Sequence, residues 1–378
     1  MHRMSEYDDI RPYYDEEVPT VVARVVDNPE FGKAASKLVM PGLLQGTPLG
    51  EWITAQLLRL KTRHVKTVRE CQLLVAEYFE RLINETIEKL TVSGLDRLDP
   101  ARHYLFISNH RDIVMDSSLL NYLMHQAGHE TCRMAVGDNL LTNNLAADLM
   151  RLNKSFVVER SVSGAKATLT ALLRTSAYIR HSLDEGVSIW IAQREGRAKD
   201  GWDRTDPAML KMLALAYKEN GSPIEDLVRG AVIVPVSISY ELDPCAPNKA
   251  HELAVTSTQG SYDKADEEDL QSIVLGMVGY KGRVHLHFGD PIEGEFEGPD
   301  ALALTIDRAI MAGMHVFPTH MAAAAALGDD STITSDDEAV MRVTEAFNQQ
   351  ISDAPEGERE YLLTQYANIL RNRKDLGV

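Results

Sequence analysis

The chain has 378 residues and a formal net charge of −17, with 44% apolar and 25% charged residues. These proportions are ordinary for a globular protein, and the length allows one large catalytic domain with helical extensions. The acidic balance argues against nucleic acid as a partner, because phosphate backbones select basic surfaces. The cysteines number three and are widely spaced, which argues against a disulfide framework or a zinc site and fits a reducing cytoplasm.

Residues 1–95 are predicted to form a helical N-terminal region. Apolar spacing predicts helices over Phe31–Met40 and Leu49–Leu60, and a long amphipathic helix from Val65 to Ile87. The stretch Arg59–Arg69 is basic, which is typical either of a solvated helix face or of a contact with a membrane surface or an acyl carrier. The N-terminal sequence lacks the apolar core of a signal peptide, and no window of about 18 uncharged apolar residues predicts a membrane-spanning helix. We therefore expect a cytoplasmic protein, with membrane contact restricted to the bilayer surface.

Residues 96–295 have a different pattern, in which short apolar runs alternate with helical periods. The predicted helices are Ile113–His125, Leu141–Leu152 and Ala165–Leu183. The predicted strands are Tyr104–Ile107, Thr131–Val136, Ser155–Val158, Val187–Ala192, Ala231–Tyr240 and Gly282–Phe288. This alternation predicts an α/β fold, a mostly parallel sheet flanked by helices, with functional groups at the carboxyl ends of the strands.

Two other stretches complete the predicted organisation. The polar stretch Glu241–Glu268 is expected to be an irregular excursion between two strands. Residues 296–378 are expected to form a helical C-terminal region, with a polar break at Gly328–Asp337 and two closing helices between Glu338 and about Arg373.

A histidine with two nearby carboxylates follows the first predicted strand of the α/β region. His110 comes directly after that strand, and Asp112 and Asp116 lie near the start of the next helix. A carboxylate can hold the tautomer of a histidine and stabilise the imidazolium that forms when the histidine acts as a general base. The same residues also fit a helix start, in which Ser108 or Asn109 caps the helix and Asp112 favours its first turn.

Cationic side chains follow two other predicted strands. Arg160 closes the block NKSFVVER, and Arg194, Arg197 and Lys199 lie in the loop QREGRAKDG. Arginine can form two parallel hydrogen bonds with a phosphate, and Gly196 lets the backbone approach a ligand closely. These residues predict a site for a phosphorylated substrate. The alternative for each of them is a solvated surface charge.

Two further features are less specific. Pro235 interrupts a buried strand, which predicts a bulge or a tight substrate wall. His285 and His287 alternate on the last predicted strand and would face the same side. No cysteine or carboxylate pattern accompanies the two histidines, so we expect no metal site there.

The order of these blocks resembles the bacterial glycerol-3-phosphate and 1-acylglycerol-3-phosphate acyltransferases. That family has a histidine followed after four residues by an aspartate, then Phe-x-x-Arg, Glu-Gly-x-Arg-Ser and Val-Pro-Val blocks, and a Phe-Gly-x-Pro-Ile ending. The corresponding segments here are Asn109-His110, Phe156 to Arg160, Glu195-Gly196-Arg197, Val234-Pro235-Val236 and GRVHLHFGDPI at residues 282–292. The resemblance covers about residues 100–295, and the helical ends lie outside it.

The sequence departs from that family at three places. Five residues, not four, separate His110 from Asp116, so either one residue loops out or Asp112 is the partner of the histidine. The two serines that follow Asp116 favour Asp116. Three residues, not two, separate Phe156 from Arg160. The third block continues with alanine and Lys199 where the family has serine, and a lysine keeps the charge without the two-pronged geometry of arginine.

The resemblance implies an O-acyltransferase of phospholipid synthesis. It would move a fatty acyl group from acyl-CoA or acyl carrier protein to a hydroxyl of glycerol-3-phosphate or 1-acylglycerol-3-phosphate, without a metal or a bound cofactor. His110 would be the general base, and Asp116 would orient it. Further implied contacts are Arg160, Arg194, Arg197 and Lys199 for the acceptor phosphate, Glu195 and Gly196 in the substrate loop, and Phe156 and Pro235 as substrate walls.

Two other functions stay open at this point. The same histidine and aspartate could activate water in a thioester or phosphoester hydrolase. A non-catalytic lipid- or carrier-binding protein could also keep this fold. The cationic positions favour transfer to a phosphorylated acceptor, and the intact Glu195-Gly196-Arg197 segment argues against a non-catalytic protein.

Overall fold

The structure, a computed structural model, describes residues 6–40, 42–141, 143–218, 222–265, 268–329 and 338–378. The chain folds into two compact units, which are treated in turn below. One unit comprises residues 1–79 and 133–171, and the other comprises residues 80–132 and 172–378. Among the described residues, no helix combines the length and apolar character needed to cross a membrane.

The first unit is mainly helical. Its helices are α1 (Val18–Val26), α2 (Pro29–Val39), α3 (Pro48–Thr62), most of α4 (Val68–Thr86), α6 (Asn144–Leu152) and the start of α7 (Ala165–Asp184). Asn28 and Thr47 cap α2 and α3, because each side chain accepts a hydrogen bond from a backbone N–H of the first turn. Buried valines of α1 form the core with Val65, Val68 and Leu152.

A short parallel strand pair completes the first unit. Strand β3 (Arg133–Gly137) pairs with β4 (Ser155–Val158), with Ala135 opposite Phe156. The predicted strands and the three predicted N-terminal helices are therefore confirmed. The prediction of helix throughout residues 1–95 is wrong at its end, because Lys89–Ser93 forms a strand, β1, in the second unit.

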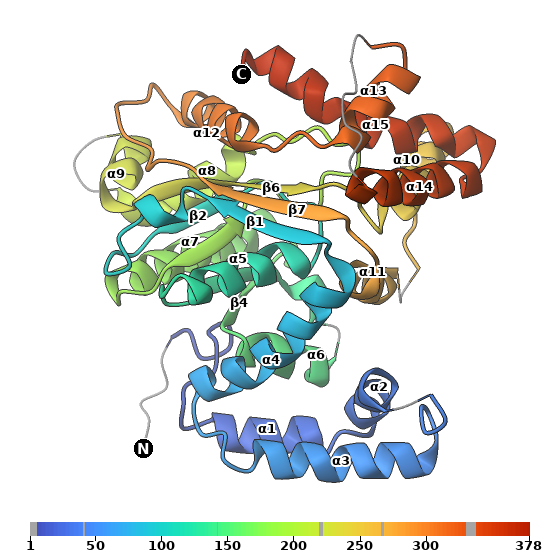
Figure 1. The fold of residues 1–378 in the computed structure, drawn as a ribbon. Helices are drawn as coiled ribbons and strands as arrows, with labels where there is room; N and C mark the ends of the chain where they lie inside the picture. Colours follow the sequence, from blue (N-terminus) through green and yellow to red (C-terminus); the bar gives the residue numbers. More distant parts are fainter. Residues whose placement is uncertain (1–5, 41, 142, 219–221, 266–267, 330–337) are drawn as a thin grey trace. The chain divides into compact units, whose positions relative to one another are not determined.

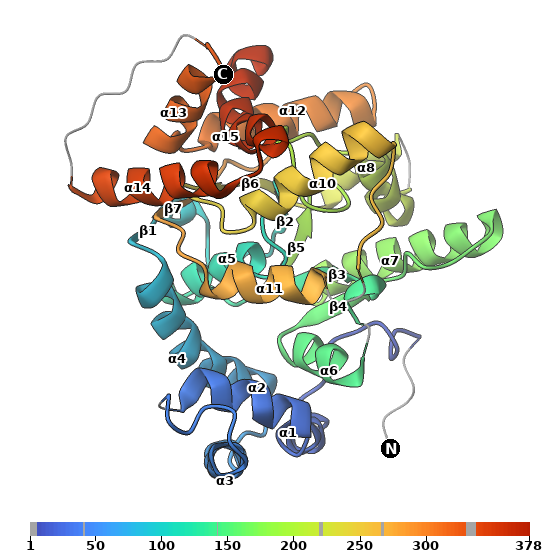
Figure 2. The same ribbon diagram turned by 90° about the vertical axis from the view of Figure 1, so that its right-hand side faces the viewer.

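The second unit is built on a sheet in which neighbours run β1, β7, β6, β2, β5 (Figure 2). The strands are β2 (Leu105–Ser108), β5 (Ile189–Ala192), β6 (Ile233–Tyr240) and β7 (Arg283–Phe288), together with β1. The pairs β1–β7, β2–β6 and β2–β5 are parallel, and β6–β7 is antiparallel. The predicted fold class, a mostly parallel sheet flanked by helices, is confirmed.

Helices cover both faces of this sheet. Figures 1 and 2 place α8 (Pro207–Ala214), α10 (Ala246–Gln259), α12 (Pro299–Gly313), α13 (Pro318–Ala326) and α15 (Glu356–Leu376) on one face. Both views place α5 (Met115–Gln126) and α11 (Glu268–Val278) on the other face. Successive side chains of β6 point to opposite faces of the sheet. On one face the Ser237 hydroxyl donates to Ile310 O of α12, and on the other the Tyr240 hydroxyl donates to Asp116 of α5. The unit also contains α9 (Pro223–Gly230), α14 (Glu338–Asp353), most of α7 and the end of α4.

The sequence-based expectations for this unit meet two corrections. The stretch Glu241–Glu268, predicted to be irregular, contains α10, whose buried Ala246 and Ala250 pack against α15. Alanines gave no strong apolar period, so the helix was missed. The two predicted closing helices are confirmed by α14 and α15. Most of the predicted break at Gly328–Asp337 lies outside the described residues.

Pro235 lies inside β6 without interrupting it, so the predicted bulge is wrong. Strand β6 keeps its register with β2 through this position, where Pro235 lies opposite Ile107. The carbonyl of Pro235 faces the β7 side and accepts a bond from Gly289 N at 2.9 Å. Pairing with β7 begins one residue later, at Val236 opposite Phe288. The missing N–H of the proline therefore points to a place where no ladder bond is required.

Candidate active site

The loop of residues 109–114, called the catalytic loop below, leaves the carboxyl end of β2. Its first residue, Asn109, is fully buried, and its amide binds the backbone of Ile238 on β6 in both directions. Asn109 Nδ2 donates to Ile238 O at 3.0 Å, and Asn109 Oδ1 accepts from Ile238 N at 2.8 Å. The role expected for Asn109 as a helix cap is therefore wrong. This amide fixes the backbone from which His110 projects.

His110 and Asp116 are hydrogen-bonded across the catalytic loop. His110 Nδ1 lies 2.8 Å from Asp116 Oδ2, with the histidine side chain 15% exposed and the aspartate side chain fully buried. The same oxygen accepts from the backbone N–H groups of Arg111 at 2.6 Å and Asp112 at 3.0 Å. The other oxygen, Oδ1, accepts from the Tyr240 hydroxyl at 2.8 Å.

The four donors determine the charge of Asp116. Burial by itself raises the pKa of a carboxylic acid, but the bonds from His110 and the backbone outweigh it, and the pKa of Asp116 is lowered. An ionised carboxylate can only accept hydrogen bonds, so the neutral His110 ring carries its proton on Nδ1. The other ring nitrogen, Nε2, is then the acceptor, which is the protonation state that a general base requires.

Asp112 has a different position, which accounts for the additional residue between His110 and Asp116. Its Oδ1 accepts from the backbone N–H groups of Val114 at 3.0 Å and Met115 at 2.8 Å, and it thus caps the start of α5. Residues 113 and 114 form a turn under this cap, which absorbs the extra residue. Burial first, and then the negative charge of Asp116, raise the pKa of Asp112.

The loop of residues 193–206, called the substrate loop below, follows β5 and is tied to the catalytic loop. Ala198 N donates to His110 O at 2.9 Å, and Gln193 N donates to Ser108 O at 2.7 Å. The Arg111 guanidinium pairs with the buried carboxylate of Asp203 in the same loop. The expectation that functional groups gather at the carboxyl ends of β2 and β5 thus agrees with the observed backbone contacts.

The residues of the substrate loop differ in their exposure and in their bonding partners. Arg194, Glu195 and Gly196 are exposed, and Gly196 has a φ of 73°, which favours glycine. Lys199 forms an ion pair with Glu252 of α10. Arg197 is half-buried; its Nη2 lies 3.4 Å from Ser272 Oγ, and its Nη1 has no hydrogen-bond partner among the described residues. Arg197 therefore keeps a buried N–H group with which it can bind an anion.

The chain matches a family model and solved structures. Residues 89–239 match the family model described as Acyltransferase. The match supports the expected family and enzyme class over the segment that holds His110, Asp116 and the substrate loop. No curated protein sequence matches the chain significantly.

Among solved structures, one match is the 1-acyl-sn-glycerophosphate (LPA) acyltransferase PlsC from Thermotoga maritima. It is 12% identical in sequence, with 79% of this chain and 95% of that chain covered, and the TM-score is 0.42.

Two predicted site residues of the matched segment belong to the first unit. Phe156 is fully buried in β4. Arg160 follows that strand, and its guanidinium lies over the backbone of Gly137, where an added Cβ would come within 3.1 Å of Nη1. The glycine thus leaves room for the Arg160 side chain. The nearby Asp138 has a lowered pKa because backbone N–H groups, including that of Ser161, outweigh the effect of burial.

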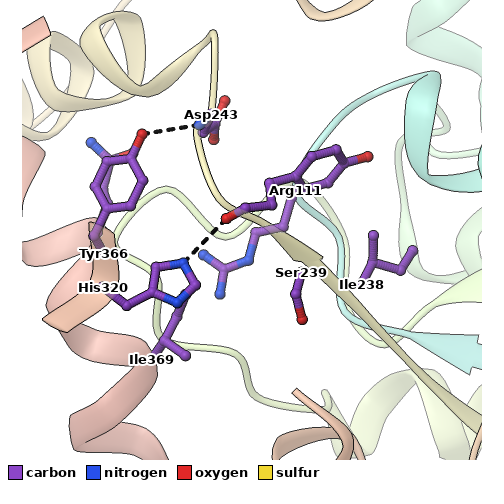
Figure 3. A pocket seen from close by; sticks show the side chains of 9 residues that line it. Arg111, Ile238, Ser239, Asp243, His320, Tyr366 and Ile369 are labelled. Carbon is purple, nitrogen blue, oxygen red and sulfur yellow. Dashed lines mark hydrogen bonds between the residues drawn. The ribbon is translucent and has the colours of Figure 1, made fainter. Parts of the chain in front are cut away.

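A small cavity lies behind the catalytic loop. Its volume is about 30 Å³, enough for a water molecule but not for a substrate. Figure 3 shows the Arg111 side chain extending toward His320 of α13. Polar residues of the catalytic loop, β6 and the C-terminal helices line it, among them Arg111, Tyr240, Asp243, His320 and Tyr366. The C-terminal helices therefore support the rear of the loop that holds His110.

Sequence reasoning missed several residues around the catalytic and substrate loops. Tyr240 binds Asp116, and Asp203 binds Arg111, over separations of 124 and 92 residues. Gln193 is 1% exposed, and neither polar atom of its amide has a partner among the described residues. The sequence signal for Gln193 was its place directly after a strand. The contacts of Tyr240 and Asp203 had no local signal.

The two histidines of β7 also lie together, as their alternation predicted. Ser93 Oγ lies 2.9 Å from His285 Nε2 and 2.8 Å from His287 Nδ1. Among the described residues, no group of three or more His, Cys, Asp or Glu side chains is arranged to hold a metal ion.

Proposed function

We propose that this protein is a glycerolipid acyltransferase. It transfers a fatty acyl group from acyl-CoA or acyl carrier protein to a hydroxyl of glycerol-3-phosphate or 1-acylglycerol-3-phosphate. The observation that carries the proposal is the bond from His110 Nδ1 to the ionised Asp116, which leaves Nε2 free to take a proton, inside a segment that matches the acyltransferase family.

In the proposed reaction, His110 Nε2 takes the proton of the acceptor hydroxyl while the oxygen attacks the thioester carbonyl carbon. The tetrahedral intermediate then breaks its C–S bond, and the leaving thiolate receives the proton from the imidazolium. Asp116 holds the ring and stabilises its positive charge through Nδ1. Atoms and charges balance without any further reactant.

We propose Arg197 as the main ligand of the acceptor phosphate. Its Nη1 is buried and without a partner among the described residues, so a phosphate oxygen would satisfy it. Its loop is tied to the His110 backbone by the Ala198 N–H. Lys199 must leave Glu252 to bind a phosphate, and so it contributes less. Arg160 and Arg194 are further proposed ligands, Glu195 and Gly196 shape the loop, and Phe156 and Pro235 remain proposed substrate walls.

We also propose that α3 and the basic stretch Arg59–Arg69, which begins within it, contact the membrane surface from the cytoplasm. Helix α3 exposes Trp52, which is 61% exposed, and further leucines at positions 49, 57 and 60. Basic residues accompany this apolar surface at Arg59, Lys61 and Arg63. Reversing these three charges should lower binding to anionic vesicles while turnover of soluble substrates stays constant. A loss of turnover as well would instead indicate a damaged fold.

The experiment that tests the function is thiol release from long-chain acyl-CoA and acyl carrier protein, with product identification. The acceptors are glycerol-3-phosphate, 1-acylglycerol-3-phosphate and none, and His110→Ala is measured beside the wild type. We expect acceptor-dependent release and a loss of about 10²- to 10⁴-fold in the variant. Release that ignores the acceptor would indicate a hydrolase, and no release from folded protein would indicate a binding protein.

A further inference from the structure

Tyr240, the last residue of β6, lies against the carboxylate that orients His110. Its hydroxyl donates to Asp116 Oδ1 at 2.8 Å, and its side chain is buried. The three other bonds to Asp116 go to Oδ2 and come from the catalytic loop itself. Tyr240 thus binds Oδ1, the oxygen that the catalytic loop leaves free. It does so from a strand end 124 residues further along the chain.

We propose that Tyr240 is a positioning residue, which fixes the rotation of the Asp116 carboxylate so that Oδ2 stays aimed at His110 Nδ1. A carboxylate turns easily about its last side-chain bond, because that torsion is broad. Bonds to both oxygens restrict this rotation. The proposal rests on the proposed function, because orientation of His110 matters only if the ring transfers a proton.

Tyr240 remains a donor at all ordinary pH values. Burial, and next the negative charge of Asp116, hold the pKa of Tyr240 well above its ordinary value. The phenol therefore stays protonated and adds no negative charge beside the carboxylate. A phenylalanine would keep the ring and lose only this bond.

The backbone of Tyr240 is held in turn by the C-terminal helices. His320 Nε2 donates to Tyr240 O at 3.1 Å, and Thr319 Oγ1 donates to Glu241 O at 2.5 Å. Figure 3 shows His320 projecting from its helix toward the strand end. Tyr240 is the first residue after the segment that matches the acyltransferase family. The inference therefore gives the region beyond that segment a part in positioning the general base.

The test compares Tyr240→Phe with Tyr104→Phe. Tyr104 is equally buried, and its hydroxyl also makes hydrogen bonds, to the backbone of Asp99 at 2.9 and 3.1 Å. We expect Tyr240→Phe to lower kcat about tenfold with unchanged KM values, and Tyr104→Phe to leave kcat unchanged. Equal effects of the two variants on kcat would overturn the proposal, because they would reflect a general loss of stability.

The kcat values of single and double variants distinguish positioning of Asp116 from a general structural role of Tyr240. Because Tyr240 acts through Asp116, Tyr240→Phe should have no further effect on kcat in an Asp116→Asn background. Additive losses would count against the proposal. The acid limb of the pH–rate profile should also shift in Tyr240→Phe and stay in place in Tyr104→Phe.

A measurement without turnover separates this inference from the proposed function. The proton on His110 Nδ1 should give a downfield proton resonance, assigned by its loss in His110→Ala. We expect the resonance to shift in Tyr240→Phe and to stay in place in Tyr104→Phe. An unchanged resonance in Tyr240→Phe would overturn the positioning role even if the enzyme is an acyltransferase. Wild-type protein that shows the shift but transfers no acyl group would instead overturn the proposed function.

Discussion

The catalytic loop and the substrate loop are neighbours in the second unit, yet they differ in how completely their polar groups are bonded. In the catalytic loop, Asn109 makes two bonds to β6 and Asp112 accepts two bonds from the start of α5, and Asp116, just after the loop, accepts four. In the substrate loop, the Gln193 amide and Arg197 Nη1 are buried without partners among the described residues.

This difference separates a site that is complete from one that a ligand would complete. A buried polar group without a partner costs about 1–3 kcal/mol, so the substrate loop carries bonding capacity that it does not use internally. A fully bonded carboxylate is instead preorganised and needs no rearrangement during the reaction. We therefore expect changes in the catalytic loop to lower kcat, and changes in the substrate loop to raise KM.

The largest expected effect is that of Asp116→Asn. The asparagine amide has no negative charge, and its oxygen must stay where Oδ2 accepts from the backbone N–H groups of Arg111 and Asp112, so the variant loses the charge that stabilises the imidazolium. We expect kcat to fall by about 10²- to 10⁴-fold, with KM nearly constant. Asp112→Asn is the matched control, and steady-state kinetics should show a loss below about tenfold. A larger loss for Asp112→Asn would assign the orienting role to Asp112.

A smaller effect is expected for Arg197→Gln, in the substrate loop. Loss of a charge-assisted bond of about 1.5–3 kcal/mol should raise the KM for the phosphorylated acceptor about 10- to 100-fold. The KM for the acyl donor should stay constant. Arg194→Gln removes an exposed charge from the same loop and should change the acceptor KM less. The opposite ranking of the two variants would make Arg194 the main phosphate ligand.

Gly276→Ala tests whether α11 supports the catalytic loop. A Cβ at this position would lie 2.0 Å from Asp112 Oδ2, so the carboxylate that caps α5 would have to move. We expect the free energy of unfolding, measured with urea, to fall by about 1–3 kcal/mol. Gly357→Ala in α15 is the control, because nothing lies within 4 Å of the added Cβ and alanine favours helix. Equal stability of the two variants would contradict the close contact.

The smallest expected effect is a loss of stability at acid pH, caused by His320 behind the catalytic loop. Burial lowers the pKa of His320 to about 3, so this residue stays neutral in the folded protein while it binds a proton near pH 6.5 when unfolded. The unfolded state thus binds more protons between those values, and stability falls as the pH falls below about 6.5. From pH 7 to 5.5 we expect His320 to account for a loss of about 1 kcal/mol.

The measurement for this effect is urea unfolding across that pH range, for the wild type and for His320→Gln. The glutamine amide can still donate to the carbonyl of Tyr240, but it does not titrate. The pH dependence should therefore be weaker in the variant. His285, whose pKa burial lowers to about 4, would supply part of the remaining slope. An identical dependence of the unfolding free energy on pH in both proteins would show that protonation of His320 does not destabilise the folded state.

The sequence predicted those features that local patterns determine. Strand β4 was predicted at its observed bounds, and His110 was placed directly after β2, because buried strands appear as short apolar runs. Strand β1, with a lysine and a serine at its ends, resembled the end of the preceding helix. The bonds from Tyr240 to Asp116 and from Lys199 to Glu252 join residues distant in sequence, which no local pattern can indicate.

The cap that Asp112 places on α5 also bears on how chains of this kind are found by motif. A search pattern that requires four residues between the histidine and the aspartate passes over this sequence, although His110 and Asp116 lie within hydrogen-bond distance. Here a carboxylate as the second of five intervening residues closes the turn and keeps the pair together. A pattern that admits five intervening residues when the second is aspartate or asparagine would recover such chains. The criterion is then the ability of that side chain to close the turn, and not only the number of residues between histidine and aspartate.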